Sequence, residues 1–344
     1  MDAEPVTEIG RRGFLAAIAV AGLAGCTTAP PPRPAAAHQP GVLGPGRAAF
    51  TLAAFDVQAQ NRVELADTLR ALSSPVPNAS VTVAVGASLF KDRFDLYWSK
   101  PRQLERMPEF RNDVLAPEWC HGDLLVQVLA DTPEAARAAL ARPVPGLAPR
   151  WRIDGFQSQD SRNLFGFREG AGNPDTSNAA AMDDLVWVGP DDDEPEWCVG
   201  GSYLVVRLIR LAMPTWDRKT TEEQEQVFGR RKESDIPLGK SEKDGGLDLP
   251  KMPVDAHVRR AAESGGRRIL RRSYSYRRSA EDTGQIFTCY QRDLKRGFET
   301  VQRGLAGEAL ERYVMPFGGG YFFVLPGPRT GTQEYVGQRL INAG

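Results

Sequence analysis

The chain has 344 residues, which is room for two domains of ordinary size or for one large domain with extra segments. Its 43 Lys and Arg residues almost balance its 44 Asp and Glu residues, and the net charge is -1. That balance argues against a protein that coats nucleic acid, because phosphate binding needs a surplus of basic charge. Only three histidines and four cysteines are present, which argues against zinc sites built from several of them.

The first 26 residues are interpreted as an export signal. Arg11 and Arg12 precede an apolar run at 16–25 that is too short to cross a membrane as a permanent helix. This order is typical of a twin-arginine signal, and the alternative is an arginine pair ahead of an ordinary hydrophobic helix. We therefore expect export by the twin-arginine route to the periplasm or the extracellular space.

The end of the apolar run resembles a bacterial lipobox, Leu-Ala-Gly-Cys at 23–26. Acylation of Cys26 would make the chain a lipoprotein with a membrane tether, whereas ordinary cleavage nearby would release a secreted protein. Residues 27–46 are rich in Pro and Ala and are predicted to form a linker. We reject His38 as a ligand because a linker histidine has no surrounding shell to orient it.

The globular part begins near residue 47, and its first half, 47–195, is predicted to run strand, helix, strand, strand, helix, strand. The predicted strands are 48–56, 80–85, 123–130 and 151–156, and the helices follow Asn61 and Thr132. Leu65, Leu69 and Leu72 recur at the spacing of one helical face. The run DLLVQVLA at 123–130 is nearly all apolar, which is typical of a strand covered on both faces.

The second half, 196–344, repeats this order. Its predicted strands are 201–211, 269–276, 285–290 and 321–325, and its predicted helices are 215–228 and a segment around Phe298, Val301 and Leu305. Two such halves are split βαβ units, so the predicted fold class is α+β with two ferredoxin-like units. The acidic stretch 189–196 is interpreted as an exposed crossover, and 230–253 as a surface loop or a lid.

Several common catalytic motifs are absent from the sequence. No P-loop or nucleophile elbow is present. The glycines at 318–320 precede an apolar strand, so we interpret them as a turn and not as a dinucleotide fingerprint. The cysteines at 26, 120, 198 and 289 include no close pair, which excludes thioredoxin-type chemistry and zinc fingers. A disulfide among Cys120, Cys198 and Cys289 stays an open alternative.

The segment 165–175, FGFREGAGNPD, is the first candidate for chemistry. Its glycines at 166, 170 and 172 permit backbone conformations that side chains forbid. Glu169 lies between them with aromatic residues on one side, where partial desolvation would raise the pKa of its carboxyl toward working pH. Such a carboxyl suits proton transfer. The alternative is a solvated turn with an incidental glutamate.

His257 is the second candidate. The other histidine of the globular part, His121, comes just ahead of a buried strand and is interpreted as structural. One histidine cannot build a tetrahedral zinc site, but it can be the single axial ligand of a haem iron. The scarcity of histidine therefore favours haem, with His257 as its ligand.

Taken in order, these segments resemble the dye-decolourising peroxidase family, and within it the exported bacterial branch that includes the proteins called deferrochelatases. The resemblance covers essentially the whole mature chain and rests on motifs at 122–127, 166–174, 200–203, 214–218, 271–276, 289–294 and 318–323, together with His257. The fold that it implies is the dimeric α+β barrel of haem peroxidases, built from two ferredoxin-like units. It also implies one haem b per chain, hydrogen peroxide as a substrate, and dyes, phenolics or other organic compounds as electron donors.

The resemblance assigns roles to several residues. His257 would be the axial ligand of the haem iron and would leave the opposite face open for peroxide. Asp293 would accept a hydrogen bond from the other ring nitrogen of His257 and so raise its basicity. Ser273 and Phe287 would line the distal pocket.

On the distal side, the resemblance makes Arg271 the cation that stabilises the charge developing as the O–O bond breaks. Arg272 is the competitor for this role, and a solvated or propionate-pairing Arg271 is the alternative. The family has aspartate where this chain has Glu169. The extra methylene could bring the carboxyl nearer to the iron or turn it away, so we expect O–O heterolysis with either Glu169 or Arg271 dominant.

Two main functions follow as hypotheses. The first is a haem peroxidase that uses peroxide and an organic donor. The second is a deferrochelatase-like protein of an iron-uptake system, which binds haem, releases its iron and has peroxidase activity as a secondary property. A surface lipoprotein on a degenerate haem fold is a third alternative. The expected partners include a second copy of the chain and a membrane reached through Cys26, but no nucleic acid.

Overall fold

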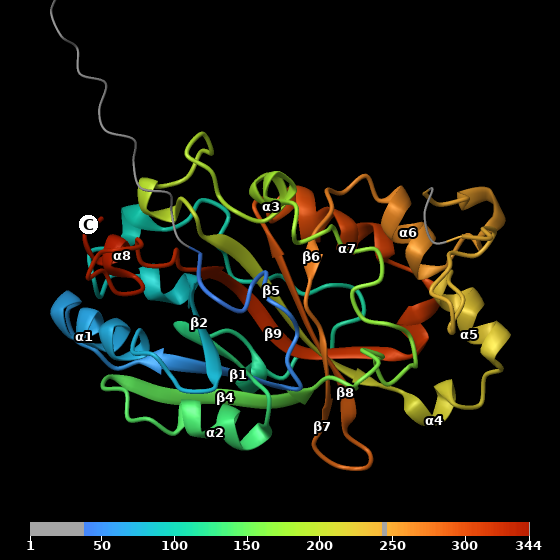
Figure 1. Cartoon of the computed structure of the whole chain (residues 1–344), viewed down its shortest axis with the longest axis horizontal. Helices are drawn as coiled ribbons and strands as arrows, with labels where there is room; N and C mark the ends of the chain where they lie inside the picture. The colour runs from blue at the N-terminus through green and yellow to red at the C-terminus, as the bar shows by residue number, and fades with distance from the viewer. Residues whose placement is uncertain (1–37, 243–245, 344) are drawn as a thin grey trace, which may run out of the picture. The chain divides into compact units, whose positions relative to one another are not determined.

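The computed structural model describes residues 38–242 and 246–343 (Figure 1). The predicted export signal, Cys26 and the first part of the predicted linker lie outside these residues. All described residues belong to one compact unit. Within them, no helix is long and apolar enough to cross a membrane.

The first half follows the predicted order of strands and helices. Its elements are β1 (Ala49–Val57), α1 (Arg62–Leu72), β2 (Ala79–Gly86), β3 (Leu124–Ala130), α2 (Pro133–Leu140) and β4 (Leu147–Phe156), followed by α3 (Ala179–Leu185). Both helices begin at side-chain caps: Asn61 accepts a hydrogen bond from the backbone N–H of Glu64, and Thr132 accepts one from that of Ala135. Residue 133 is proline, which suits the first helical turn because it needs no amide partner there.

The second half has the predicted elements with some breaks. They are β5 (Ser202–Leu211), α4 (Met213–Trp216), α5 (Thr221–Phe228), α6 (His257–Glu263), β6 (Leu270–Arg271), β7 (Tyr274–Arg277), β8 (Thr283–Gln291), α7 (Thr300–Leu305), β9 (Val314–Val324) and α8 (Gln338–Ile341). The single helix predicted at 215–228 is two helices, because Thr220 and Glu223 form a capping box that starts α5. The strand predicted at 269–276 is likewise interrupted, between β6 and β7.

The strands form one antiparallel sheet in the order β5-β9-β2-β3-β1-β4-β7-β8-β6, and an additional pairing of β5 with β8 closes it. The predicted α+β class is therefore confirmed as a mixed fold with a large antiparallel sheet. The first half contributes the order β4-β1-β3-β2, and the second contributes β9-β5-β8-β7. The two halves are joined where β2 pairs with β9 and where β4 meets β7.

The two faces of the closed sheet are covered differently. Leu52 of β1, Leu125 of β3 and Leu208 of β5 belong to one buried cluster, which fills the face enclosed by the sheet. The opposite face of the first half packs against α1 through Leu65, together with Leu69 and Leu72. Because both faces of β3 are covered, all seven of its residues are buried, as its continuous apolar run predicted.

The glycines at 318–320 were predicted to form a turn, and that prediction is wrong. They lie inside β9, opposite β5, where the register shifts between Leu208 and Ile209. Gly319 has a φ of 120°, and a side chain there would collide with the carbonyl oxygen of Val206. Glycine is needed at this irregularity because the two backbones approach closely.

His38 and Gln39, within the predicted linker, pack against the globular part of the chain. The ring of His38 stacks on Trp187 at 3.7 Å between centroids, and its Nδ1 lies 3.0 Å from the carbonyl oxygen of Gly200. Gln39 is buried and donates to the carbonyls of Val83 and Leu325 at 2.7 and 2.6 Å. The interpretation of His38 as a residue without a surrounding shell is therefore wrong, because its ring and its Nδ1 have tertiary partners.

Candidate active site

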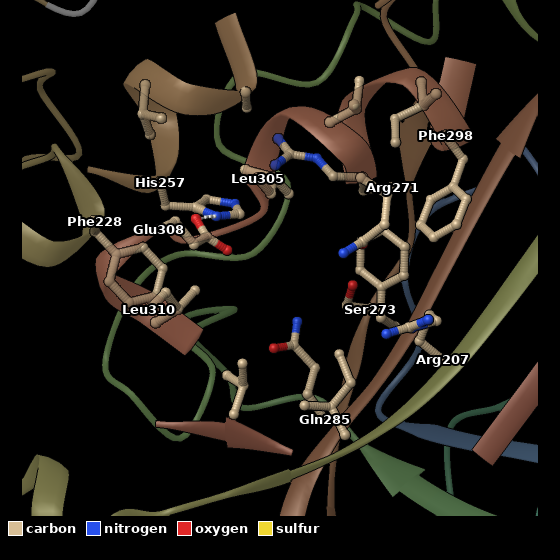
Figure 2. A pocket seen from close by; sticks show the side chains of 18 of the residues that line it. Arg207, Phe228, His257, Arg271, Ser273, Gln285, Phe298, Leu305, Glu308 and Leu310 are labelled. Carbon is tan, nitrogen blue, oxygen red and sulfur yellow. Dashed lines mark hydrogen bonds and ion pairs between the residues drawn. The ribbon is translucent and has the colours of Figure 1, made fainter. Parts of the chain in front are cut away.

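A cavity of about 730 Å³ lies between the outer face of β5 and β8 on one side and α5, α6 and α7 on the other (Figure 2). Residues from 109–112 and 163–172 of the first half complete its wall. On β8, residues alternate between the faces of the sheet, so Gln285 and Phe287 face the cavity while Ile286 belongs to the enclosed core. Five of the predicted site residues line this cavity: Glu169, His257, Arg271, Ser273 and Phe287.

His257 is the first residue of α6, and its ring faces the cavity across from Arg271 and Ser273 (Figure 2). Its Nδ1 lies 2.6 Å from Oε2 of Glu308, a side chain that is only 8% exposed. Because the buried Glu308 carboxylate accepts a hydrogen bond from Nδ1 of His257, it fixes the tautomer of the ring that has its proton on Nδ1. Nε2 is left unprotonated and available as a ligand.

Asp293 does not have the predicted contact with His257. Its Oδ1 accepts a hydrogen bond from the backbone N–H of Arg296 at 2.9 Å, at the start of the turn 295–299, and its side chain is not part of the cavity wall. The carboxylate that contacts the imidazole is Glu308, 51 residues away from it in sequence. The local pattern after β8 could not indicate this, because Glu308 lies in the loop after α7 and only the tertiary structure brings it beside the imidazole.

Glu169 is held by two side-chain amides. Nδ2 of Asn163 and Nε2 of Gln285 both donate to its Oε1, at 2.9 and 2.8 Å. Burial raises the pKa of the Glu169 carboxyl above its ordinary value, although the Asn163 hydrogen bond and the charge of Arg271 act in the opposite direction. The alternative of a solvated turn is wrong, since this carboxyl lies in the cavity wall with defined partners.

Arg271 forms the short strand β6 and is fixed by the same loop that carries Glu169. Its Nη2 donates to the carbonyl oxygen of Ala171 at 2.7 Å, and its carbonyl oxygen accepts from Nδ2 of Asn173 at 2.8 Å. Burial lowers the pKa of this guanidinium, while the negative charge of Glu169 raises it. The neighbouring Arg272 instead donates to the carbonyl of Gly44, outside the cavity wall. Of the two arginines, only Arg271 faces the cavity.

Sequence reasoning missed Asn163, Gln285 and Glu308. A signal for Gln285 was present, because it lies two residues before Phe287 and a strand places such residues on one face. Asn163 and Glu308 lie in loops, where the sequence carries no periodic signal. His121 is outside the cavity wall, and burial together with Arg106 and Arg150 lowers the pKa of its ring to about 4.

The rest of the wall fits a flat apolar group with anionic substituents. Phe228, Phe298 and Leu305 supply apolar surface, while Arg230 and Arg268 supply cationic side chains. The volume lies within the range of small-molecule and cofactor pockets. With a single imidazole whose Nε2 is available, these residues fit haem, which needs an axial ligand, apolar contacts to its ring and cations for its carboxylates.

The described cysteines do not contribute to the site chemistry. Cys120, Cys198 and Cys289 are all buried and unpaired, so no disulfide links them in the part of the chain that the structure describes. Burial raises the pKa of the Cys289 thiol, which keeps it protonated and unreactive.

Two family models match the chain: the N-terminal model of Dyp-type peroxidases over residues 74–157 and the C-terminal model over 160–329. A protein of Escherichia coli O6:K15:H31 named deferrochelatase is 38% identical over 88% of this chain and 86% of its own length. Ferric DtpA from Streptomyces lividans has a similar structure, with a TM-score of 0.81, 32% identity and coverage of 89% and 95% of the two chains. A DyP-type peroxidase from Streptomyces coelicolor gives the same values.

Proposed function

Because this chain belongs to the Dyp-type peroxidase family, oxidoreductases that act on peroxide and bind haem, we propose that it holds one haem b and reduces hydrogen peroxide with organic donors. One observation carries the proposal: a single cavity has His257 with its carboxylate partner on one side and Glu169 and Arg271 in its wall. His257 would be the axial ligand, with Ser273 and Phe287 in the distal wall.

The proposed mechanism gives each polar residue one task. When bound, haem supplies an iron at which the O–O bond of peroxide is broken and through which donors are oxidised. Glu169 would accept a proton from one oxygen of bound peroxide and return it to the other oxygen, which leaves as water. Its raised pKa suits the second transfer, because a less acidic carboxyl holds the proton until the oxygen leaves. Arg271 stabilises the negative charge that develops on the leaving oxygen.

Glu308 acts through His257. By accepting the Nδ1 proton of the ring, its carboxylate orients the imidazole and raises the basicity of Nε2. Two of the arginines in the wall, Arg230 and Arg268, would pair with the two carboxylates of haem.

For the fold, we propose that the closed sheet is the dimeric α+β barrel of haem peroxidases, with its two ferredoxin-like units within one chain and a boundary at 195/196. The matching strand orders β4-β1-β3-β2 and β9-β5-β8-β7 support this interpretation. Assembly of two chains into a homo-oligomer is a separate proposal, which measurement of the mass in solution would test.

A second candidate function is deferrochelatase-like release of iron from haem. The relatives named deferrochelatase favour it, as does the glutamate at position 169. The two functions differ in their products: peroxidase turnover leaves the haem intact and oxidises a donor, whereas iron release leaves a metal-free porphyrin, which fluoresces.

The deciding experiment follows the mature protein, reconstituted with haem, by visible absorption and porphyrin fluorescence before and after addition of peroxide and a phenolic donor. We expect a Soret band, a spectral change with peroxide and repeated donor oxidation. Porphyrin fluorescence without donor turnover would favour iron release. Absence of a Soret band after reconstitution would contradict both functions and favour a degenerate haem fold.

For localisation, we propose the twin-arginine route with residues 1–26 as the signal and Cys26 as an acylated tether. Only the sequence pattern supports this proposal. Mass spectrometry of the mature N-terminus tests it: an acylated Cys26 is expected, and an unmodified N-terminus further along the chain would contradict the tether.

A further inference from the structure

The two amide donors of Glu169 converge on one of its oxygens. Gln285 reaches Oε1 from β8, and Asn163 reaches the same atom from the loop before the glycine-rich segment. The Asn163 side chain is itself fixed, because its Oδ1 accepts the backbone N–H of Phe167 at 3.1 Å. Oε1 therefore has two amide donors supplied by the protein, and the Ser273 hydroxyl also hydrogen-bonds to this carboxyl. Oε2, to which neither amide donates, is the oxygen left for proton exchange.

The backbone of Gln285 is also held rigidly. It lies in the middle of a closed sheet, paired with Ile209 of β5 on one side and Ser275 of β7 on the other. A side chain on such a strand is positioned more precisely than one on a loop. Glutamate has one more rotatable bond than the aspartate usual in this family, and a second fixed donor limits that extra freedom.

We propose that Gln285 is a positioning residue for the peroxide reaction, which together with Asn163 holds Oε1 of Glu169 so that Oε2 carries the proton. The proposal rests on the proposed function of Glu169 and extends it to a residue on another strand. Gln285 does not itself exchange a proton, since an amide is not acidic or basic in the working range of pH.

The donors also favour the ionised carboxylate. The titratable and charged groups that face Glu169 are Arg271 on β6, Arg230 on the loop after α5, and His257 on α6 with its partner Glu308. Burial opposes ionisation of Glu169, while Asn163, Arg271 and Ser273 favour it. Loss of one amide shifts this balance toward the protonated acid, because a hydrogen bond to the charged form is lost.

The test replaces Gln285 by methionine, which has a similar shape and no amide. The rate of reaction with peroxide falls on the acid side, where Glu169 becomes protonated. In Gln285→Met we expect this acid limb to move to higher pH by roughly one to two units, the equivalent of one hydrogen bond to a charged group. A Gln333→Met variant, at an exposed position outside the cavity wall, should leave the limb unchanged.

A second readout does not depend on turnover. In haem-free protein labelled with ¹³C at glutamate carboxyls, the Glu169 signal, assigned by its loss in Glu169→Gln, should titrate at a higher pH in Gln285→Met than in the parent. If the methionine variant does not fold, Gln285→Asn, whose amide is one methylene shorter, should shift both readouts in the same direction.

The Glu169→Gln variant tests the role of Glu169 separately from that of Gln285. If it retains the acid limb, the proposed role of Glu169 is wrong, and the role of Gln285 is overturned with it. If it removes the limb but Gln285→Met changes neither the limb nor the carboxyl titration, only the inference about Gln285 is overturned, and the peroxidase function stands.

Discussion

In the first half of the sheet, α2 packs against β1, β2 and β3, and α1 covers the same outer face with its leucines. In the second half, α6 contacts both α5 and α7, and the cavity separates these helices from the outer face of β5 and β8. The corresponding strands have the same order in both halves. One arrangement of strands therefore supports a solid core in one half and a binding site in the other, depending on what covers its outer face.

The third strands of the two halves show the difference at the level of residues. β3 is apolar along almost its whole length, and its buried Gln127 donates to the carbonyl of Gly41. β8 instead places Gln285 and Phe287 on the cavity side. Gln285 on the outer face of β8 has a partner in the site, so we expect substitutions in the cavity wall to alter chemistry and those under α1 and α2 in the first half to alter stability.

Of the substitutions that test this difference between the halves, His257→Ala is expected to have the largest effect. Loss of the only imidazole in the cavity wall should abolish stable haem binding, measured as haem content per chain after reconstitution. His121→Ala is the matched control, because His121 lies outside the wall, and it should keep a full haem complement. A normal haem content in His257→Ala would show that the second half holds its cofactor in another way.

Arg271→Ala should give the next largest effect. We expect the rate of reaction with peroxide to fall by about 100- to 1,000-fold, because the removed cation stabilises charge only in the transition state. The neighbouring Arg272→Ala should change this rate little, since Arg272 contacts Gly44 outside the cavity. Rapid mixing with peroxide measures both, and equal losses in the two variants would contradict the assignment.

In the first half, Leu65→Ala should act on stability and not on chemistry. Leu65 has no exposed surface and lies on the buried face of α1, so its truncation should lower the free energy of unfolding by about 2–5 kcal/mol. Val63→Ala, at a side chain that is 72% exposed on the same helix, should change it by less than about 0.5 kcal/mol. Urea unfolding gives both values. A loss of peroxidase rate in folded Leu65→Ala protein would mean that the two halves are more strongly coupled than this comparison implies.

Glu308→Gln should have the smallest of these effects. The amide still accepts the Nδ1 proton of His257 but carries no charge, so haem should bind with an affinity lowered by about 10- to 100-fold. Glu263→Gln on α6, where an exposed carboxylate pairs with Arg259, is the control. Haem titrations of the two variants should differ, and an unchanged affinity in Glu308→Gln would contradict the partnership with His257.

Much of the architecture was predictable from the sequence because apolar spacing reports which face of a strand or helix is covered. The order of elements in both halves, the apolar run of β3 and the caps of α1 and α2 all follow from local patterns. Errors occurred where long-range contacts override local signals. The glycines at 318–320 lie within β9 because of the close approach of β5, and His38 packs on a tryptophan far along the chain.

The candidate site also contains residues that the sequence predicts and contacts that only the structure shows. Glu169, His257 and Arg271 were identified from residue type, scarcity and motif, and the sequence by itself determined which groups are available for chemistry. Only the tertiary structure decided which groups meet. Glu308, and not the predicted Asp293, lies beside His257. Arg271 faces the cavity, whereas Arg272 does not. Gln285 donates a hydrogen bond to Glu169, which lies 116 residues before it in sequence. The physical reason is that hydrogen bonds act over about 3 Å, and the distances between residues far apart in sequence depend on the packing of the whole sheet.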